Sequence, residues 1–204
     1  MNAEAEIKKG RKFDQVLEGA RDVFMCDGFE GASVDTIAKA AGVSKATLYS
    51  YFPDKRLLFM EVARCECCRQ ADEAVEVIDM NAPIRTILTG ASTRMLDFFL
   101  SEFGARVFRI CVAESDRFPE LGREFYESGP ALVRGRIQDY LAKAVAKGEL
   151  AIDDVELAAE QFIEMSRAHL FPRMLFGVQT EFSAEDRKRI TEGAVDTFLA
   201  RYGV

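Results

Sequence analysis

Apolar residues recur along most of this chain at intervals of three and four positions, the spacing of one buried face of an α-helix. No stretch alternates convincingly between apolar and polar residues, as a half-buried strand would. The pattern predicts an all-α fold of about nine helices, over residues 12–27, 34–41, 45–52, 55–79, 84–103, 105–115, 119–147, 154–176 and 183–201.

Two of the predicted helices carry clear local signals inside or at their ends. Pro130 cannot donate a backbone N–H, so the helix over 119–147 is expected to kink or divide near Ser128. Ser183 is followed three residues later by Asp186, the arrangement of a capping box at a helix start.

The second and third helices form the most informative pair. Ser33 can cap the first of them, and Gly42 stands where a left-handed residue would end it, because only glycine takes a positive φ without steric cost. Ser44 can cap the second, whose Leu48 and Phe52 point back at the first. The apolar stripe of the first helix consists of Val34, Ile37, Ala38 and Ala41.

The opposite side of the second helix is small and hydroxyl-bearing, where an ordinary surface helix would carry long charged side chains. Short side chains let a helix backbone enter a groove, hydroxyls can bond to phosphate oxygens, and lysines neutralise phosphate charge. These features predict a helix-turn-helix whose second helix faces the major groove of DNA. The alternative is an αα-corner in an unrelated helical protein. The residues concerned are Lys45, Ala46, Thr47, Tyr49 and Ser50, with Lys55 and Arg56 just beyond the helix.

Residues 13–55 resemble the N-terminal domain of the tetracycline-repressor (TetR) family of transcriptional regulators. The resemblance implies an all-helical homodimer, with a three-helix DNA-binding head on each subunit and a larger helical body that binds a small molecule and dimerises. It rests on three motifs: Phe24-x-x-x-Gly28-Phe29-x-x-Ala32-Ser33-Val34, Ile37-Ala38-x-x-Ala41-Gly42-Val43-Ser44 and Thr47-Leu48-Tyr49-x-Tyr51-Phe52-x-x-Lys55.

We therefore expect a DNA-binding domain over residues 1–54 and an effector-binding and dimerisation domain over 55–204. The expected function is a repressor that leaves double-stranded operator DNA when a small, largely apolar effector binds. The alternative is a helical interaction protein that does not read DNA. The expected DNA-contacting residues are Ser33, Ser44, Lys45, Ala46, Thr47, Tyr49, Ser50, Tyr51 and Lys55.

Charge is divided unevenly along the chain. The formal net charge is −7, yet residues 1–56 carry equal numbers of acidic and basic side chains, so the acidity belongs to the rest. A basic arm before the first helix, together with the lysines around the second short helix, favours phosphate contact over a merely solvated face. The arm consists of Lys8, Lys9, Arg11 and Lys12.

The effector pocket is a weaker expectation. Eleven of the 16 phenylalanines lie beyond residue 60, which favours an apolar or aromatic ligand, although any single one is also explained as core. His169, the only histidine, is explained by a structural role or by a polar contact to the ligand. The candidate pocket residues are Met95, Phe99, Phe103, Cys111, Phe125, Phe162 and His169. The segment 125–130 loosely resembles a subfamily with broad, hydrophobic pockets.

Dimerisation is expected through the last two predicted helices, as the family resemblance implies. Alanines on the first would allow close approach, and the alternative is that both faces belong to the core of a single chain. The faces are Val155, Ala158, Ala159, Phe162, Met165, Ser166 and His169 on one helix, and Ile190, Ala194, Val195, Phe198 and Leu199 on the other.

Several classes of function are not supported. There is no Gly-x-Ser-x-Gly elbow, phosphate-binding loop or dinucleotide fingerprint, so no enzyme and no cofactor are expected. One distant histidine and the crowded Cys65-Glu66-Cys67-Cys68 suit zinc poorly. All five cysteines, which also include Cys26 and Cys111, are expected to be small buried thiols, with a redox sensor as the alternative. Without an apolar span or signal peptide, we expect a cytoplasmic protein that does not contact a membrane.

Overall fold

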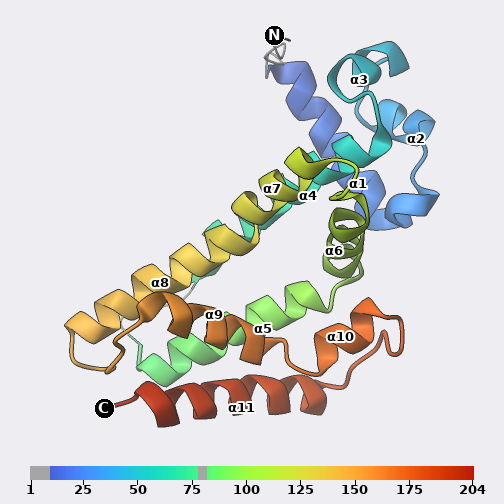
Figure 1. Ribbon diagram of the computed structural model, residues 1–204. Coiled ribbons are helices and arrows are strands. Elements are labelled where there is room, and N and C mark those ends of the chain that lie inside the picture. Colours follow the sequence, from blue (N-terminus) through green and yellow to red (C-terminus); the bar gives the residue numbers. More distant parts are fainter. Residues whose placement is uncertain (1–9, 78–81) are drawn as a thin grey trace.

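The computed structural model describes residues 10–77 and 82–204, and within these ranges its regular elements are helices (Figure 1). One isolated antiparallel bridge joins Leu150 to Gly203. The helices are α1 (Arg11–Gly31), α2 (Val34–Ala40), α3 (Lys45–Tyr51), α4 (Lys55–Val77), α5 (Ile84–Phe99), α6 (Glu102–Glu114), α7 (Pro119–Ser128), α8 (Pro130–Ala146), α9 (Val155–Ser166), α10 (Leu170–Leu175) and α11 (Ala184–Tyr202).

Helices α1 to α3 and the start of α4 form a head at one end of the molecule (Figure 1). The apolar faces predicted from the sequence meet there, with Val16, Ile37 and Leu48 among its fully buried side chains. Helix α1 comes very close to the end of α2, because a Cβ on Gly19 would lie 2.5 Å from the backbone nitrogen of Ala41. Glycine is therefore required at position 19 by the packing itself.

Two glycines of the head have positive φ, one after α2 and one inside α1. Gly42 has φ +64 directly after α2, as the helix-turn-helix pattern predicted. Gly28 has φ +69 and breaks α1, although one further helical turn follows it and brings the segment to Gly31. Positive φ is accessible at both positions because glycine has no Cβ.

The body is built around two groups of helices. Helix α4 runs diagonally from the head alongside α7 and α8, while α5, α9 and α11 lie together at the far end (Figure 1). Helix α6 stands between this far group and α1, so the head meets the body through α4 and α6. On α6, the guanidinium of Arg109 donates to the carbonyls of Met174 and Leu175 at 2.6 and 2.7 Å, which fastens α10 to it.

The all-α prediction is confirmed, but two predicted helices are each divided. The helix expected over 119–147 breaks at Gly129 and Pro130, as the proline predicted. The helix expected over 154–176 breaks at His169, which the sequence did not predict. His169 has φ +65 and ψ −47, and the Leu170 N–H donates to the Ala168 carbonyl at 2.7 Å, closing a strained γ-turn.

Boundaries elsewhere follow side-chain caps. The helix expected over 84–103 ends at Phe99 because the Ser101 hydroxyl accepts the Gly104 N–H at 2.9 Å and starts α6. The capping box at the start of α11 is present, with Ser183 and Asp186 each accepting the other's backbone N–H. No helix in the described ranges is long and apolar enough to cross a bilayer.

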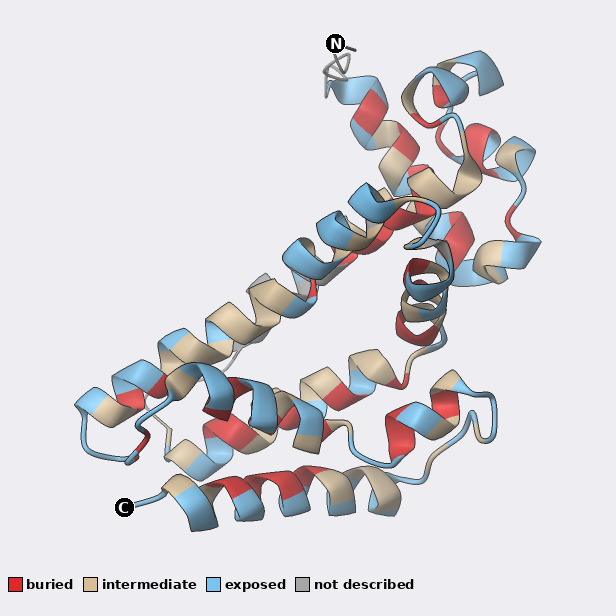
Figure 2. Cartoon of the chain, in the orientation of Figure 1, coloured by how far each residue is buried: buried red, intermediate tan, exposed pale blue. Residues whose placement is uncertain are grey.

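Apart from the exposed His169, the faces predicted to dimerise pack into the core of the single chain, so the prediction of these faces is wrong, whereas dimerisation through the two helices stays a prediction. Ala158 and Phe162 of α9 and Val195 and Phe198 of α11 are fully buried, and the rings of Phe162 and Phe198 lie 5.2 Å apart. Figure 2 shows these buried faces turned toward each other and toward α5, with exposed residues on the outer sides. The alternative weighed above, an intrachain core, is the correct one for these faces.

Candidate nucleic-acid interface

Helix α3 is anchored on one side and bare on the other. Its Leu48 and the following Phe52 are buried in the head, and the Ser44 hydroxyl caps it by accepting the Thr47 N–H at 3.1 Å. The outward face is exposed at Lys45, Ala46, Tyr49 and Ser50 and half-buried at Thr47, in agreement with the sequence prediction (Figure 2). A rigidly held helix with a small, polar, exposed face lies at the tip of the head (Figure 1).

The hydroxyls on this surface are held by local hydrogen bonds. Ser33 caps α2 by accepting the Thr36 N–H at 3.0 Å, in the way that Ser44 caps α3. The Ser50 hydroxyl donates to the Thr47 carbonyl at 2.7 Å. The Ser33 and Ser44 hydroxyls also share hydrogen bonds with the Thr36 and Thr47 hydroxyls, at 2.7 and 2.9 Å. The Ser50 hydroxyl only donates here, so its lone pairs can accept a further hydrogen bond.

Lys45 is tied to the neighbouring helix. Its ammonium forms an ion pair with the Asp35 carboxylate at the start of α2. The hydrogen bond to Asp35 raises the pKa of Lys45. Because both side chains are largely exposed, the ammonium can also turn toward a phosphate. Sequence reasoning missed Asp35, although an acidic residue in the first turn of α2 was visible.

Lys55 has a structural role that the sequence did not reveal. Its ammonium donates to the carbonyls of Phe29 and Ala32 at 2.8 and 3.0 Å and lies 4.4 Å from the centre of the Phe29 ring. The Lys55 ammonium therefore satisfies two backbone carbonyls at the irregular C-terminal end of α1. Its contact with a phosphate stays a prediction.

Two more residues near α3 pack into the head. Tyr51, a predicted contact residue, is half-buried with its ring edge-on to Phe13 at 5.6 Å. Arg56 hydrogen-bonds the Asp54 carboxylate, with its Nε 3.1 Å from Oδ1, and this bond lowers the pKa of Asp54. In the basic arm, Arg11 and Lys12 are exposed on the first turn of α1, whereas residues 8 and 9 lie outside the described residues.

The seven candidate pocket residues do not surround one cavity. Met95 and Phe162 belong to the α5, α9 and α11 core; Phe99 packs on Phe171 at 5.0 Å, and His169 is exposed. The others lie nearer the head: Phe103, Phe125 and the buried Cys111, whose thiol points at Met60. Of the seven, only Phe103 lines the cavities where α1 and α4 meet α6.

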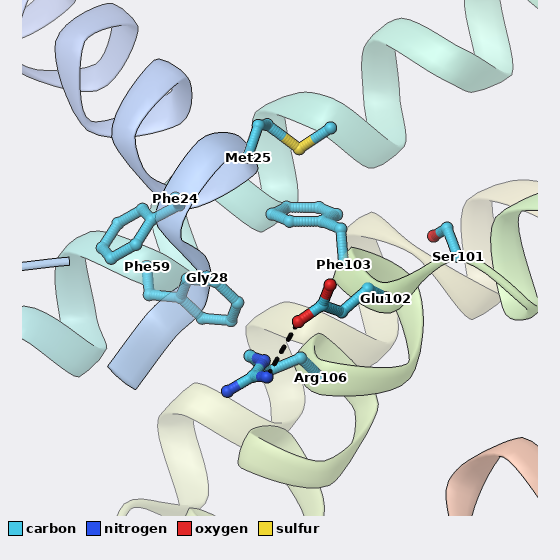
Figure 3. Close-up of a pocket in the computed structure, with 8 residues that line it drawn as sticks. All are labelled: Phe24, Met25, Gly28, Phe59, Ser101, Glu102, Phe103 and Arg106. Carbon is cyan, nitrogen blue, oxygen red and sulfur yellow. Dashed lines mark hydrogen bonds and ion pairs between the residues drawn. The ribbon is translucent and has the colours of Figure 1, made fainter. Parts of the chain in front are cut away.

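A small cavity lies where α1 and α4 of the head meet α6. It has a volume of about 160 Å³, and Figure 3 shows the rings of Phe24, Phe59 and Phe103 gathered at it, beside the ion pair of Glu102 and Arg106. Sequence reasoning missed four of these five residues, because α1, α4 and α6 are far apart along the chain. Nothing local in the sequence places them together.

Four of the five cysteines, Cys26, Cys65, Cys68 and Cys111, have side chains that the structure describes. No group of three or more potential metal ligands occurs among the residues that the structure describes. Cys111 is buried and Cys65 and Cys68 are half-buried, whereas Cys26 is exposed, so the prediction of buried thiols is wrong for Cys26. A hydrogen bond with Asp27 raises the pKa of the Cys26 thiol, which disfavours the reactive thiolate.

Comparison with known proteins agrees with this geometry. The family model described as bacterial regulatory proteins of the tetR family matches residues 16–62, and the one described as the C-terminal domain of AefR-like transcriptional repressors matches residues 86–204. The transcriptional repressor AcnR of Corynebacterium glutamicum is 25% identical to this chain over 185 residues. The match covers 91% of this chain and 93% of the AcnR chain.

Two solved structures extend the similarity over nearly the whole chain. One is a TetR-family regulator from Mesorhizobium loti, with a TM-score of 0.83 and 28% identity, covering 98% of this chain and 100% of its own. The other is a flavonoid-responsive regulator, FrrA, with a TM-score of 0.70 and 37% identity, covering 96% and 98%. The matched families and the named relatives are transcriptional regulators, not enzymes.

Proposed function

Because this chain belongs to the tetracycline-repressor family of transcriptional regulators, we propose that it is a homodimeric repressor which a small aromatic effector releases from its operator. The repressor relatives support DNA binding and repression as its general activity. The remaining steps of this function are DNA reading by α3, dimerisation and release from the operator.

The observation that carries DNA reading is the exposed face of α3. Ala46 and Ser50 are short enough to let the helix backbone approach base edges, and Thr47 and Tyr49 offer hydroxyls to bases or phosphates. The buried Leu48 and the Ser44 cap keep this face outward without help from DNA. Such a helix is pre-organised for the major groove.

A gel-shift titration with the DNA that flanks the protein's own coding region tests this reading. Ala46→Leu is expected to abolish the specific shift, because the added bulk keeps the backbone out of the groove. Ala142→Leu, at an exposed alanine of α8, is the matched control and should bind as the parent does. Specific binding by Ala46→Leu would favour the alternative in which α3 does not read DNA.

Dimerisation is proposed through the outer sides of α9 and α11, opposite the faces buried in the chain. The exposed side of α11 carries Gly193, Thr197 and Ala200, which lie along one face of the helix and would let a second copy approach closely. Leu157 of α9 is half exposed. A two-fold pair would present two α3 helices to successive major grooves, about 34 Å apart.

Gly193→Arg tests the dimer without disturbing the chain's own packing, because no atom beyond the adjacent backbone of α11 lies within 4 Å of a Cβ placed there. Light scattering should report a monomer for this variant. Gly135→Arg on α8 also meets nothing within 4 Å, so it controls for the change of residue and should stay dimeric. A dimeric Gly193→Arg would move the interface elsewhere.

An aromatic effector is supported by the flavonoid-responsive relative FrrA and by the phenylalanine-rich body. A ligand that prefers the conformation unsuited to the operator lowers DNA affinity by its difference in binding free energy. A thermal-shift screen of flavonoids and simpler aromatic compounds, followed by gel shifts with each hit, tests this step. Hits that stabilise the protein and leave operator binding unchanged would contradict release.

A further inference from the structure

The junction between head and body contains two cavities that share a wall. The first, of about 160 Å³, lies among α1, α4 and α6, and the second, of about 330 Å³, lies among α1, α4, α5 and α6. Met25, Ser101 and Phe103 line both, so the cavities adjoin. Met25 belongs to the head, and the other two belong to the α5–α6 corner of the body.

The first cavity suits one aromatic ring. The rings of Phe24 and Phe103 lie 4.9 and 5.6 Å from that of Phe59, and all three line the cavity (Figure 3). Its volume is similar to that of an engineered apolar cavity of roughly 150 Å³ that admits benzene. The nearby carboxylate of Glu102 is compensated by Arg106 at 3.0 Å.

The second cavity supplies cationic side chains. Arg69 of α4 and Arg94 of α5 both line it, next to the apolar side of Phe98. The one acidic residue on its wall, Asp97, is paired with Arg187 at 2.7 Å. Guanidinium groups bind carboxylates through strong, often bidentate hydrogen bonds. We propose that the joined cavities bind a small aromatic carboxylate, with its ring among the three phenylalanines and its carboxylate at Arg69 and Arg94.

The proposed site lies next to an ion pair that joins the head to α4. Arg69 also hydrogen-bonds the buried carboxylate of Glu66, whose Oε2 accepts from the Arg21 Nε of α1 at 3.0 Å. A ligand carboxylate at Arg69 competes with Glu66 for that guanidinium and so changes the charge balance around the Arg21–Glu66 pair, which joins α1 to α4. The effect on operator affinity rests on the proposed function, whereas binding at the site does not.

The site can be tested with 3-phenylpropionate as the probe and its amide as an uncharged match. With methionine methyl groups labelled with carbon-13, the Met25 methyl, assigned through Met25→Leu, should shift saturably in the full-length protein. The amide should bind about tenfold more weakly or worse, because it loses the charge-assisted hydrogen bonds. No saturable shift of Met25 up to about 10 mM, or equal affinity for the amide, would overturn the proposal.

Two variants localise the binding independently of that signal. Met25→Trp fills the shared wall from a half-exposed position and should remove binding, and Arg94→Gln should weaken it by about tenfold. Val112→Trp on α6 and Arg123→Gln on α7 are the exposed controls, and they should bind as the parent does. Parental affinity in both test variants would overturn the site even if one of them folded poorly.

Gel shifts run in parallel separate the site from the proposed function. Operator binding by the free protein that 3-phenylpropionate weakens supports both. Ligand binding with unchanged operator affinity supports the site and removes it from the release mechanism. A free protein that binds no operator would contradict the proposed function and leave the ligand-binding result standing.

Discussion

The head and the far end of the body differ in how their cores are closed. The head core is completed by residues from the body, since Val107 and Cys111 of α6 pack into it beside Phe59 at the start of α4. The core of α5, α9 and α11 is closed by the body's own helices, around Phe162 and Phe198. A shift of α4 or α6 therefore disturbs the head core directly, while the far core can stay intact. This asymmetry is what a regulator needs if its DNA-reading end is to respond.

Charge follows the same division. Near the head, the carboxylate of Glu66 is buried between two arginines, one from α1 and one from its own helix. At the far end, ion pairs such as Arg85 with Asp196 lie on the surface and contribute little to stability. A buried charge must keep its partners, so the junction tolerates fewer arrangements than the outer helices do.

The largest expected effect comes from opening the shared head core. Phe59 is almost fully buried against Phe24, Phe29 and Phe103. Phe59→Ala should lower the free energy of unfolding by about 3–5 kcal/mol through lost transfer energy and a cavity. In native-state hydrogen exchange, α1 to α3 should lose more protection than α9 and α11 do.

Phe176→Ala is the matched control for that experiment, because Phe176 is 80% exposed on the loop after α10. Its stability should stay within about 0.5 kcal/mol of the parent. If Phe59→Ala lost as much protection in α11 as in α1, the two cores would unfold as one unit. The proposed difference between the head and the far end of the body would then be wrong.

A smaller effect is expected from the buried carboxylate. Glu66→Gln removes the charge that holds Arg21 and Arg69, and should cost about 1–3 kcal/mol; the loss is limited because both arginines are over 40% exposed and can regain water. Chemical denaturation measures it. Glu192→Gln, at an exposed pair with Lys188, is the control and should change stability by less than about 0.5 kcal/mol. If the two variants lost equal stability, the buried carboxylate of Glu66 would contribute no more to stability than an exposed ion pair does.

The cap at the recognition helix comes next. Ser44→Ala should cost about 1 kcal/mol, because the Thr47 N–H loses its acceptor at the start of α3. Ser183→Ala at α11 removes an equivalent cap and should cost a similar amount. Only Ser44→Ala should weaken operator binding as well. Equal DNA affinity in the two variants would show that the order of α3 does not depend on its cap.

The head was predictable from sequence because its signals are local. Ser33, Gly42 and Ser44 each mark a boundary through their own backbone or hydroxyl, and the structure has each of them in that role. The roles of Lys55 and Glu66 were not predictable. The partners of Lys55 are carbonyls 23 and 26 residues away, and Arg21 is 45 residues from Glu66, so no local pattern indicates them.

In the body, the helices could be predicted from the sequence, but their packing could not. Helical periodicity predicted where these helices lie, but it did not show which apolar faces are buried within the single chain and which are left for a second copy. The alanines and phenylalanines of α9 and α11 have the same pattern whether they meet α5 or a second copy. The break at His169 was also hidden, because a γ-turn at a non-glycine residue has no sequence signature and is held by the packing of α10 on α6. Long-range packing, not propensity, decides both.

The smallest expected effect compares acidic groups of the two regions. Hydrogen bonds lower the pKa of Asp54 in the head, through Arg56, and of Asp186 in the body, through Ser183. Since each folded-state pKa lies below the unfolded value of about 3.9, each group contributes stability above that pH and loses it as the pH falls through the folded pKa. The thermal midpoints of Asp54→Asn and Asp186→Asn should therefore lie below that of the parent at neutral pH and approach it below about pH 4. If the Asp54 variant kept a constant offset at every pH, the Asp54–Arg56 bond would not contribute to the acid sensitivity of the head.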